Sequence, residues 1–572
     1  MSEALTPLSK LINEKSTVEI LDFCRYVANS YEIAAACICG PTVYGVSDAK
    51  TTVEVLLVIH DFQPRLMNHV KILDKRKLII FAVDKWVFER DVDRGFLGEA
   101  LAEKIIFPYI SLMDEDYLHL QEVRVKKRIT LELLENLILD FPELSYEIHV
   151  KPEYFMYETM LSRARVFPPM TYDLLSLMRK NVKKRNLELI MHGYSEALTE
   201  LKKENLITFS NGYARISRKL IDKTKPRKTR FTNLFKTAQR SLFKSLLGVF
   251  PKALNVIAQD RDTFSRFQKN MQKNSKLFQL VEDPKKHLCV PTARGLVPLS
   301  SRMSIKVFAR KVLSVSEDVD IKVEEIGGVL NDVYMFKTKV NHEEKKIVVK
   351  KFRDWSGFKW FPLALWTLGT RAFAVLGRSR MEREHAISQL LYEKSFAVPK
   401  ILHTSHDERL IFFEFVEGEN LTEIIKRIAN SKQREHVKKE LHLISKVGEK
   451  IARVHALGIA LGDSKPENFI IGKKGKIYML DFEQAARNGD KVWDVAEFLY
   501  YSGHYVPPLA RTRSAEHIAK AFIHGYLRAG GEAKLIKQAG SPKYTKVFSV
   551  FTFPSVMLAI SNICRKTGRM NK

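Results

Sequence analysis

The chain has 572 residues, and its 45% hydrophobic, 10% aromatic and 28% charged residues are typical of globular domains and exclude a largely disordered protein. A chain of this length is too long for a single hydrophobic core, so we expect about three or four domains. The 94 lysines and arginines against 66 aspartates and glutamates give a net charge of +28, which favours acidic partners (nucleic acid, an anionic membrane or a nucleotide), with a solvated basic surface as the alternative.

Residues 1–115 alternate helical and strand patterns and predict an α/β domain. Buried strands are expected over Val53–Ile59 (VEVLLVI) and Leu78–Val83 (LIIFAV), because both are short, continuous apolar runs. The stretch Cys39–Val58 (CGPTVYGVSDAKTTVEVLLV) runs into the first of these strands and carries two glycines ahead of the strand start.

This stretch resembles the motif of polymerase-β-type nucleotidyltransferases. The resemblance assigns the two metal carboxylates to Thr52 and Glu54, with Asp84 as the candidate for a third acid. Two-metal catalysis needs anionic ligands, and threonine is not one. We therefore expect a nucleotidyltransferase-like domain that keeps the fold and lacks the activity; a plain α/β domain is the alternative.

A helical connector is predicted over residues 116–164, followed by a small unit over 165–222. In that unit a helical pattern ends near Asn205, and an Asn211-Gly212 turn joins two short apolar runs, which is a strong hairpin signal. Helices followed by a two-stranded hairpin resemble a winged helix. That resemblance implies contact with nucleic acid, and a docking module is the alternative.

A basic run over 218–244 begins a basic and helical linker region assigned to residues 223–320. Such a run can follow a phosphate backbone, although a solvated linker is the alternative. Together with the preceding unit it suggests RNA or DNA contact through residues 165–250.

Residues 326–338 (IGGVLNDVYMFKT) predict a strand, a turn and a second strand, with Gly327 and Gly328 in the turn. Glycines let a backbone approach a phosphate closely, and a simple hairpin is the alternative. The strand expected over 345–352 turns Lys350 to one face and its neighbour to the other. Glu384, on a helical pattern, is the expected partner of Lys350, with Glu382 as the alternative.

A strand followed by a short connector is expected over residues 411–421 (IFFEFVEGENL). Downstream, residues 461–485 read LGDSKPENFIIGKKGKIYMLDFEQA. This segment carries the loop Asp463-Ser464-Lys465-Pro466-Glu467-Asn468, then a strand, a turn, a second strand and Asp481-Phe482-Glu483. A loop carboxylate, an amide five residues on and a second carboxylate beyond a hairpin are the groups that a metal–phosphate site requires.

The order of these parts over about Ile321–Gly540 resembles the protein-kinase-like superfamily, whose catalytic loop is D-L-K-P-E-N and whose metal-binding segment is D-F-G. The resemblance implies that ATP and Mg²⁺ are the cofactors and assigns a role to each candidate residue. The assigned groups are the phosphate cover (Gly327, Gly328), the phosphate-binding pair (Lys350, Glu384), the adenine-binding backbone (Glu414, Val416), the catalytic pair (Asp463, Lys465) and the metal ligands (Asn468, Asp481).

Three departures from the protein-kinase pattern narrow the group of kinases that the chain resembles. Leu461-Gly462 replaces the usual His-Arg, and Glu483 replaces the last glycine of D-F-G, which should make that segment harder to flip. Only the ten residues from Gln484 to Trp493 separate Glu483 from Asp494, the expected acid of a central helix, so there is no room for an activation segment. The chain is in this respect similar to RIO kinases, the small kinase of the KEOPS complex, and aminoglycoside- and lipopolysaccharide-type kinases.

The compartment is inferred from the cysteines and from apolar stretches. Five scattered cysteines, with no Cys-x-x-Cys pair, favour neither a disulfide framework nor a zinc site, so we expect a cytoplasmic protein. The N-terminus lacks the apolar run of a signal peptide. The uncharged stretch 547–564 contains Pro554, which favours a packed terminal helix over a membrane span, so no integral membrane segment is expected.

The sequence thus predicts a multidomain α+β protein: a nucleotidyltransferase-like domain, a winged-helix-like unit, a bilobal protein-kinase-like domain over 321–545, and a terminal helix with a basic tail over 546–572. The predicted function is Mg²⁺-dependent transfer of the γ-phosphoryl group of ATP to a Ser or Thr hydroxyl on a protein substrate that the sequence does not identify. The alternatives are an ATPase switch, a small-molecule kinase of the same fold, or a nucleic-acid-associated factor whose kinase domain senses ATP.

Overall fold

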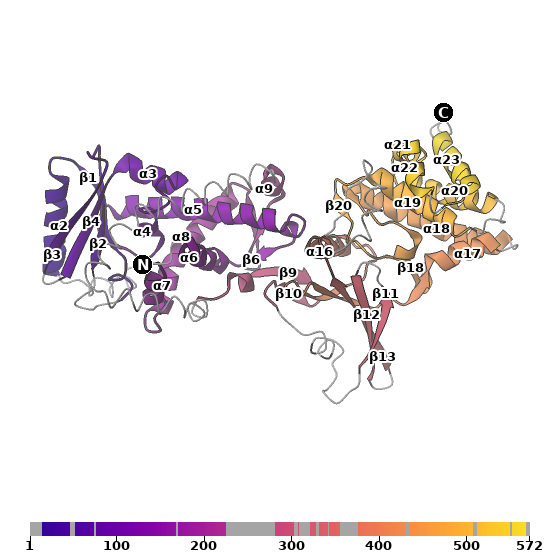
Figure 1. Ribbon diagram of the computed structural model, residues 1–572, viewed down its shortest axis with the longest axis horizontal. Coiled ribbons are helices and arrows are strands. Elements are labelled where there is room, and N and C mark those ends of the chain that lie inside the picture. Colours follow the sequence, from indigo (N-terminus) through magenta and orange to yellow (C-terminus); the bar gives the residue numbers. More distant parts are fainter. Residues whose placement is uncertain are drawn as a thin grey trace. The chain divides into compact units, whose positions relative to one another are not determined.

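The computed structural model describes residues 14–45, 52–73, 76–166, 170–224, 281–301, 307, 310, 321–327, 331–340, 343–354, 376–430, 434–506, 512–549 and 552–567 (Figure 1). The chain divides into two compact units, Met1–Cys289 and Val290–Lys572. The finer division into six segments stays a prediction.

The first unit begins with a five-stranded sheet of order β3-β4-β2-β1-β5. Strands β2 and β4 are parallel, and the other neighbours are antiparallel. Both predicted strands are confirmed, and β2 is buried along its whole length. The elements are α2 (Glu14–Ala28), β1 (Ile33–Cys39), β2 (Val53–Ile59), β3 (Leu66–Leu73), β4 (Arg76–Asp84), α3 (Lys85–Arg94), α4 (Glu103–Ile106) and β5 (Ile110–Met113).

Helices and a short sheet complete the first unit. The predicted hairpin is confirmed: Ser210 pairs with Tyr213, and Asn211 and Gly212 both have positive φ, as a two-residue loop requires. The elements are α5 (Glu115–Asp140), η1 (Leu144–Tyr146), β6 (His149–Val150), α6 (Glu153–Val166), α7 (Met170–Leu177), α8 (Lys183–Lys203), β7 (Ile207–Ser210), β8 (Tyr213–Ile216) and α9 (Arg218–Lys223).

The structure differs from two sequence predictions between residues 116 and 301. Residues 116–164 are not an uninterrupted helical connector: α5 ends before Pro142, and β6 then pairs with β8, so the hairpin belongs to a wider sheet. The described part of the predicted helical linker, residues 281–301, contains η3 (Pro284–His287), β9 (Leu288–Thr292) and β10 (Gly295–Pro298). Its prolines and β-branched residues favour strands over helix, and Gly295 takes φ +110° where β10 begins.

The second unit contains a five-stranded antiparallel sheet of order β11-β12-β13-β15-β14. The predicted strand pair and the strand that carries Lys350 are confirmed. Met381 of α16 packs with Phe352, Ile401, Ile411 and Phe413, and this small core fixes the helix to the sheet. The elements are β11 (Lys322–Gly327), β12 (Asn331–Val340), β13 (Glu343–Phe352), α16 (Gly377–Glu393), β14 (Ile401–Ser405) and β15 (Leu410–Glu414).

The rest of the second unit is mainly helical around one large apolar core. The predicted single terminal helix over 547–564 is two helices, because Pro554 starts a new one at its first turn. The elements are β16 (Gly418–Asn420), α17 (Leu421–Asn430), α18 (Arg434–Ala456), β17 (Ile459–Ala460), η4 (Pro466–Asn468), β18 (Phe469–Gly472), η5 (Lys473–Gly475), β19 (Ile477–Met479), β20 (Ala486–Arg487), α19 (Lys491–His504), α20 (Arg513–Arg528), α21 (Ala533–Ala539), α22 (Pro542–Phe548) and α23 (Pro554–Lys566).

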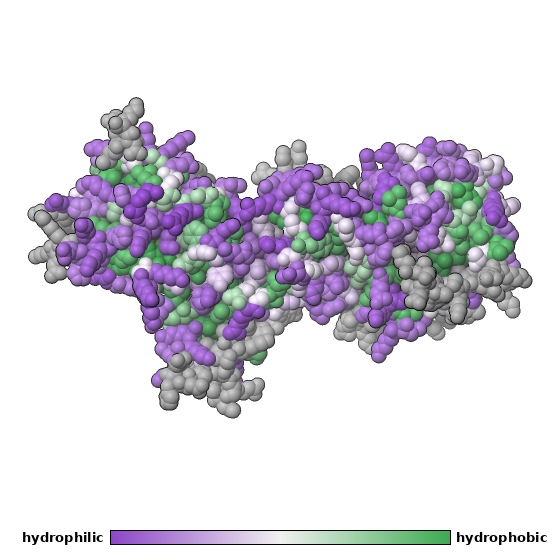
Figure 2. All heavy atoms as spheres, turned by 180° about the vertical axis from the view of Figure 1, so that it is seen from behind, coloured by the Kyte–Doolittle hydropathy of each residue, from purple (hydrophilic) through white to green (hydrophobic). Residues whose placement is uncertain are grey.

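Hydrophilic residues cover much of the described surface on the face drawn in Figure 2, with smaller apolar patches between them. Among the described residues, no helix combines the length and the apolar character that crossing a membrane requires. All five cysteines are free thiols with buried side chains.

Candidate active site

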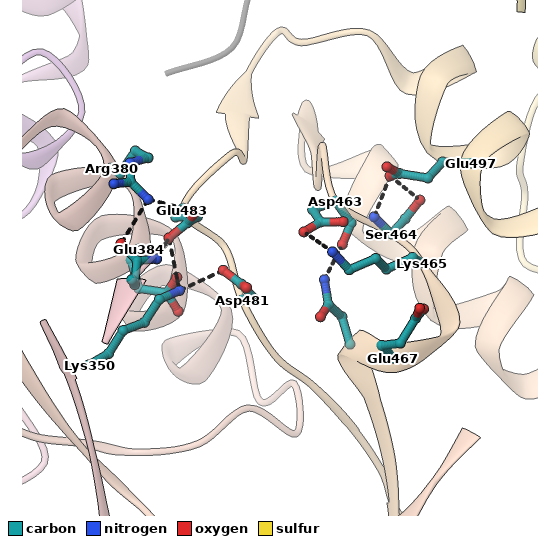
Figure 3. Close-up of polar contacts among 12 residues, drawn as sticks. Lys350, Arg380, Glu384, Asp463, Ser464, Lys465, Glu467, Asp481, Glu483 and Glu497 are labelled. Atoms are coloured by element: carbon teal, nitrogen blue, oxygen red, sulfur yellow. Dashed lines mark hydrogen bonds and ion pairs between the residues drawn. The ribbon is translucent and has the colours of Figure 1, made fainter. Parts of the chain in front are cut away.

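Lys350 lies at the centre of a buried network of acids. It points from β13 to the inside and is 7% exposed, whereas Lys351 on the other face is exposed, as the alternation of a strand requires. Its Nζ is 2.7 Å from Asp481 Oδ1, 3.2 Å from Glu384 Oε2 and 3.0 Å from Glu483 Oε2 (Figure 3). The expected contact with Glu384 is therefore present.

Glu382, the alternative partner considered for Lys350, contacts other groups. One of its carboxylate oxygens accepts a hydrogen bond from Arg378 Nε at 3.0 Å and lies 3.4 Å from His406 Nε2. Because residues 382 and 384 lie two positions apart on α16, their side chains leave the helix in different directions, and the carboxylate of Glu384 is the one that reaches Lys350.

The charges of this network shift one another's pKa values. Burial alone would lower the pKa of Lys350, but attraction to Asp481, Glu384 and Glu483 raises it well above its usual value. Burial raises the pKa of Glu384 to about 8, and the like charges of Asp481 and Glu483 add to this effect while Lys350 opposes it. At neutral pH we therefore expect a charged lysine beside a Glu384 that carries a proton much of the time.

Glu483 and Arg380 are functional candidates that the sequence reasoning missed. Arg380 of α16 is fully buried, and its guanidinium donates to Glu483 Oε1 at 3.0 Å and to Asn331 Oδ1 at 2.8 Å. Asn331 of β12 also donates to Glu483. Two signals were available: a carboxylate stood where kinases have glycine, and Arg380 precedes Glu384 by one helical turn, which places both on one face of α16.

The loop with the catalytic candidates lies beside the segment that carries Asp481. Lys465 Nζ is 3.0 Å from Asp463 Oδ2, and the amide of Asn468 donates to the carbonyl oxygen of Asp463 at 2.7 Å. The backbone N–H of Leu480 donates to Asn468 O at 2.9 Å. These bonds hold the loop against the residue that precedes Asp481.

Asp463 and Asp481 influence each other. Burial and the charge of Asp481 raise the pKa of Asp463 to about 6, although Lys465 opposes the shift. Burial would also raise the pKa of Asp481, but Lys350 and then Lys465 outweigh it and lower that pKa. The two carboxylates thus differ at neutral pH: Asp481 is a fixed anion, and Asp463 titrates close to the physiological range.

Two acids of α19 position the loop. Asp494 is fully buried and accepts hydrogen bonds from the backbone N–H groups of Leu461 at 2.6 Å and Gly462 at 2.7 Å. Glu497 accepts from the backbone N–H of Ser464 at 2.7 Å, and its position is visible in Figure 3. The residues that replace the usual His-Arg are therefore held through their backbone, which does not depend on their side chains.

The donor set fits a hard divalent cation. Carboxylate oxygens of Glu384, Asp481 and Glu483 lie within 4.8 Å of one another. These three acids meet the two buried cations Lys350 and Arg380, so the network carries more carboxylates than cations. Oxygen ligands are what Mg²⁺ prefers. Of the two expected ligands, Asp481 belongs to this group, and Asn468 lies with Asp463.

The structure does not test the residues assigned to the phosphate cover and to the adenine-binding backbone. Gly327 ends β11, and Gly328 lies outside the described residues. Glu414 ends β15, and its side chain accepts from the backbone N–H of Lys400 at 3.1 Å. Val416 follows in the connector to β16. The roles assigned to these four residues stay predictions.

The N-terminal acids have structural partners. Glu54 forms an ion pair with Lys104. Asp84 is the N-cap of α3 and accepts from the backbone N–H groups of Trp86 at 3.1 Å and Val87 at 3.3 Å. The nucleotidyltransferase resemblance and the expected lack of transferase activity both stay predictions.

The helix expected to contact nucleic acid packs against α5. Lys127 of α5 lies 2.8 Å from Glu200 and 2.7 Å from Glu204, so the charged positions of this face pair within the unit. The basic run beyond Thr224 lies outside the described residues. Contact of residues 165–250 with RNA or DNA stays a prediction.

Two comparisons with known proteins gave matches. Residues 345–500 match the Lipopolysaccharide kinase (Kdo/WaaP) family. A stretch of 107 residues is 29% identical to the KEOPS complex subunit Bud32 of Pyrococcus abyssi (strain GE5 / Orsay) and covers 19% of this chain and 45% of that protein. The chain therefore spans about half the length of this relative. The family match makes residues 345–500 similar to a kinase family, and neither match supports the nucleotidyltransferase resemblance of the N-terminal domain.

Proposed function

We propose that the second unit is an active ATP-dependent phosphotransferase that uses Mg²⁺. The observation that carries this proposal is the contact of Lys350 with both Glu384 and Asp481, in a region where Asp481 also acts electrostatically on Asp463 and Lys465. Phosphoryl transfer is catalysed mainly by positioning and charge. A lysine, a fixed carboxylate and a titrating carboxylate assembled in one place supply both.

Each residue then has a defined task. Lys350 binds phosphate oxygens and is kept in position by Glu384, while Lys465 stabilises the charge on the transferred group. Asp481 and Asn468 would hold Mg²⁺, with Glu483 as a further acid beside Asp481. When bound, Mg²⁺ would neutralise charge on the phosphates. Asp463 accepts the proton of the acceptor hydroxyl. The hydroxyl oxygen forms a bond to the γ-phosphorus as the bond between that phosphorus and the ADP oxygen breaks.

The acceptor that we propose is a Ser or Thr hydroxyl on a protein, in the cytoplasm. The support is the loop Asp463–Asn468, which follows the protein-kinase pattern at all but one position, and the resemblance to Bud32, a subunit of a protein complex. The five buried cysteines form no disulfide, which supports a reducing compartment.

A small molecule is the second candidate acceptor. Only ten residues separate Glu483 from Asp494, which leaves no activation segment on which a peptide could lie, and residues 345–500 match a family of lipopolysaccharide kinases. An ATPase switch of the same fold has the same support from the short segment.

Nucleic-acid association through residues 165–250 is a further proposal, and salt-dependent binding of RNA to the full chain tests it.

The acceptor classes are separated by one experiment with γ-labelled ATP and Mg²⁺. The purified chain is incubated with a generic protein acceptor or with a lipopolysaccharide, and the label is followed into protein, saccharide and free phosphate. Label on protein supports the proposal, label on saccharide supports the small-molecule kinase, and free phosphate alone supports the ATPase. The Lys350→Ala variant is the control for contaminating kinases, and equal labelling by this variant refutes the site.

A further inference from the structure

A second group of side chains with metal-ligand chemistry lies in the first unit, on helices α5 and α8. His119 belongs to α5, and His192 and Glu196 belong to α8. One nitrogen of each imidazole and one oxygen of the carboxylate all lie within 4.8 Å of one another. His192 and Glu196 are four residues apart, so both side chains project from the same face of α8 toward α5.

Glu196 links the two imidazoles. Its Oε2 lies 3.0 Å from His119 Nε2, and its Oε1 lies 3.2 Å from His192 Nδ1. The two rings are 5.6 Å apart between centroids. The side chains are 35%, 52% and 43% exposed for His119, His192 and Glu196, so an ion from solvent can reach all three.

A buried carboxylate lies near the second nitrogen of His119. Glu122 Oε2 lies 3.6 Å from His119 Nδ1, on the opposite side of the ring from Glu196, and the Glu122 side chain is 11% exposed. Tyr109 donates to the same oxygen at 3.0 Å, and Lys126 donates to the other oxygen at 2.5 Å. In protein metal sites a ligating histidine commonly directs its second nitrogen to such a fixed carboxylate, which sets the tautomer and the ring orientation.

We propose that His119, His192 and Glu196 bind a divalent transition-metal ion, with zinc as the best fit, and that the ion links α5 to α8. Two imidazole nitrogens and one carboxylate oxygen, with water in a fourth position, form a common zinc donor set. A tetrahedral zinc with bonds of about 2.1 Å keeps its ligand atoms about 3.4 Å apart. Oε2 of Glu196 lies 3.0 Å from His119 and its Oε1 lies 3.2 Å from His192, so each carboxylate oxygen is close to that spacing from one ring.

The same donor set excludes the hard cations. Mg²⁺ and Ca²⁺ take oxygen ligands, and two of these three donors are imidazole nitrogens. This site therefore differs in its metal preference from the all-oxygen group of Glu384, Asp481 and Glu483 in the second unit. The difference makes the two sites separable in one sample, because excess Mg²⁺ occupies oxygen ligands and leaves imidazole available.

The test is a zinc titration of the metal-stripped full chain, without a histidine tag and in excess Mg²⁺, followed by calorimetry. Co²⁺ in place of Zn²⁺ gives a second readout, the visible absorption of a tetrahedral ion. The variants are His192→Ala and Glu196→Gln, whose side chains are about half exposed. His517→Ala, an exposed histidine on α20 in the second unit, is the matched control.

We expect one zinc ion per chain in the wild type and in His517→Ala. Affinity should fall at least about tenfold in His192→Ala and in Glu196→Gln, with the Co²⁺ absorption lost, because each removes one of three protein ligands. Circular dichroism checks that the variants are folded. Zinc binding that is unchanged in both variants, or no saturable zinc binding by the wild type, would overturn the proposal.

Discussion

The candidate acids of the two units differ in what they contact. In the second unit, Glu384, Asp481 and Glu483 share Lys350, and three acids lie beside two cations once Arg380 is included. In the first unit, Glu54 pairs with Lys104, and Asp84 caps a helix through backbone N–H groups.

That difference separates acids that are available for chemistry from acids that stabilise a fold. A capping carboxylate already accepts hydrogen bonds from backbone N–H groups, so it is less available for chemistry. An excess of carboxylates around one lysine is instead costly without a further cation or a proton, since like charges at short range repel. Such an arrangement persists where a ligand compensates it, which is the physical reason to look for catalysis in the second unit.

The largest expected effect is the loss of Lys350 or Asp481. Lys350→Ala and Asp481→Ala should each lower phosphoryl transfer at least about 1,000-fold, because each removes a charge that stabilises the transition state. Measurement of labelled phosphate transfer checks this, with circular dichroism to verify the fold. Lys351→Ala, on the opposite face of the same strand, is the control and should retain its rate. Turnover like that of the wild type in either site variant would contradict the assignment.

The next effect concerns pH. The pKa of Asp463 is raised to about 6, so its carboxylate form, which accepts a proton, is lost as the pH falls through that value. We expect kcat/KM to drop about tenfold for each pH unit below about 6. Asp463→Asn should have a rate about 100-fold lower and without this acid limb. A wild-type profile with no acid limb down to about pH 4.5 would exclude Asp463 as the base.

A third prediction concerns Glu483. Glu483→Gly restores the usual kinase residue but leaves Arg380 without its carboxylate partner in the buried network, so the second unit should lose about 3 kcal/mol of stability. Calorimetric unfolding, with each unit's transition resolved, measures the change. Glu419→Gln, which removes an exposed pair with Arg427, is the matched control and should cost less than about 1 kcal/mol. Equal stability of the two variants would show that the buried network contributes little.

The smallest effect is expected in the first unit. Asp84→Ala removes the N-cap of α3 and should lower the stability of that unit by about 1–2 kcal/mol. Phosphoryl transfer should stay within about twofold of the wild type, because the catalytic candidates belong to the other unit. A large fall in phosphoryl transfer with Asp84→Ala would contradict the assignment of a structural role to Asp84.

Much of the candidate site could be predicted because its signals are local. The loop Asp463–Asn468 places its groups within six residues, and strand alternation decides between Lys350 and Lys351. The turn at Asn211-Gly212 is equally local, since both residues tolerate positive φ. In each case neighbouring residues restrict the backbone, so the sequence alone determines the outcome.

Tertiary structure decided the contacts between distant residues. Arg380 meets Glu483 across 103 positions, and His119 meets Glu196 across 77. The pairing of β6 with β8 and the strands β9 and β10 depend likewise on partners that no local pattern indicates. A buried charge or a strand edge pairs with whichever residue the packed chain places beside it. The pairing of distant acids, bases and strands is therefore decided only when the core has formed.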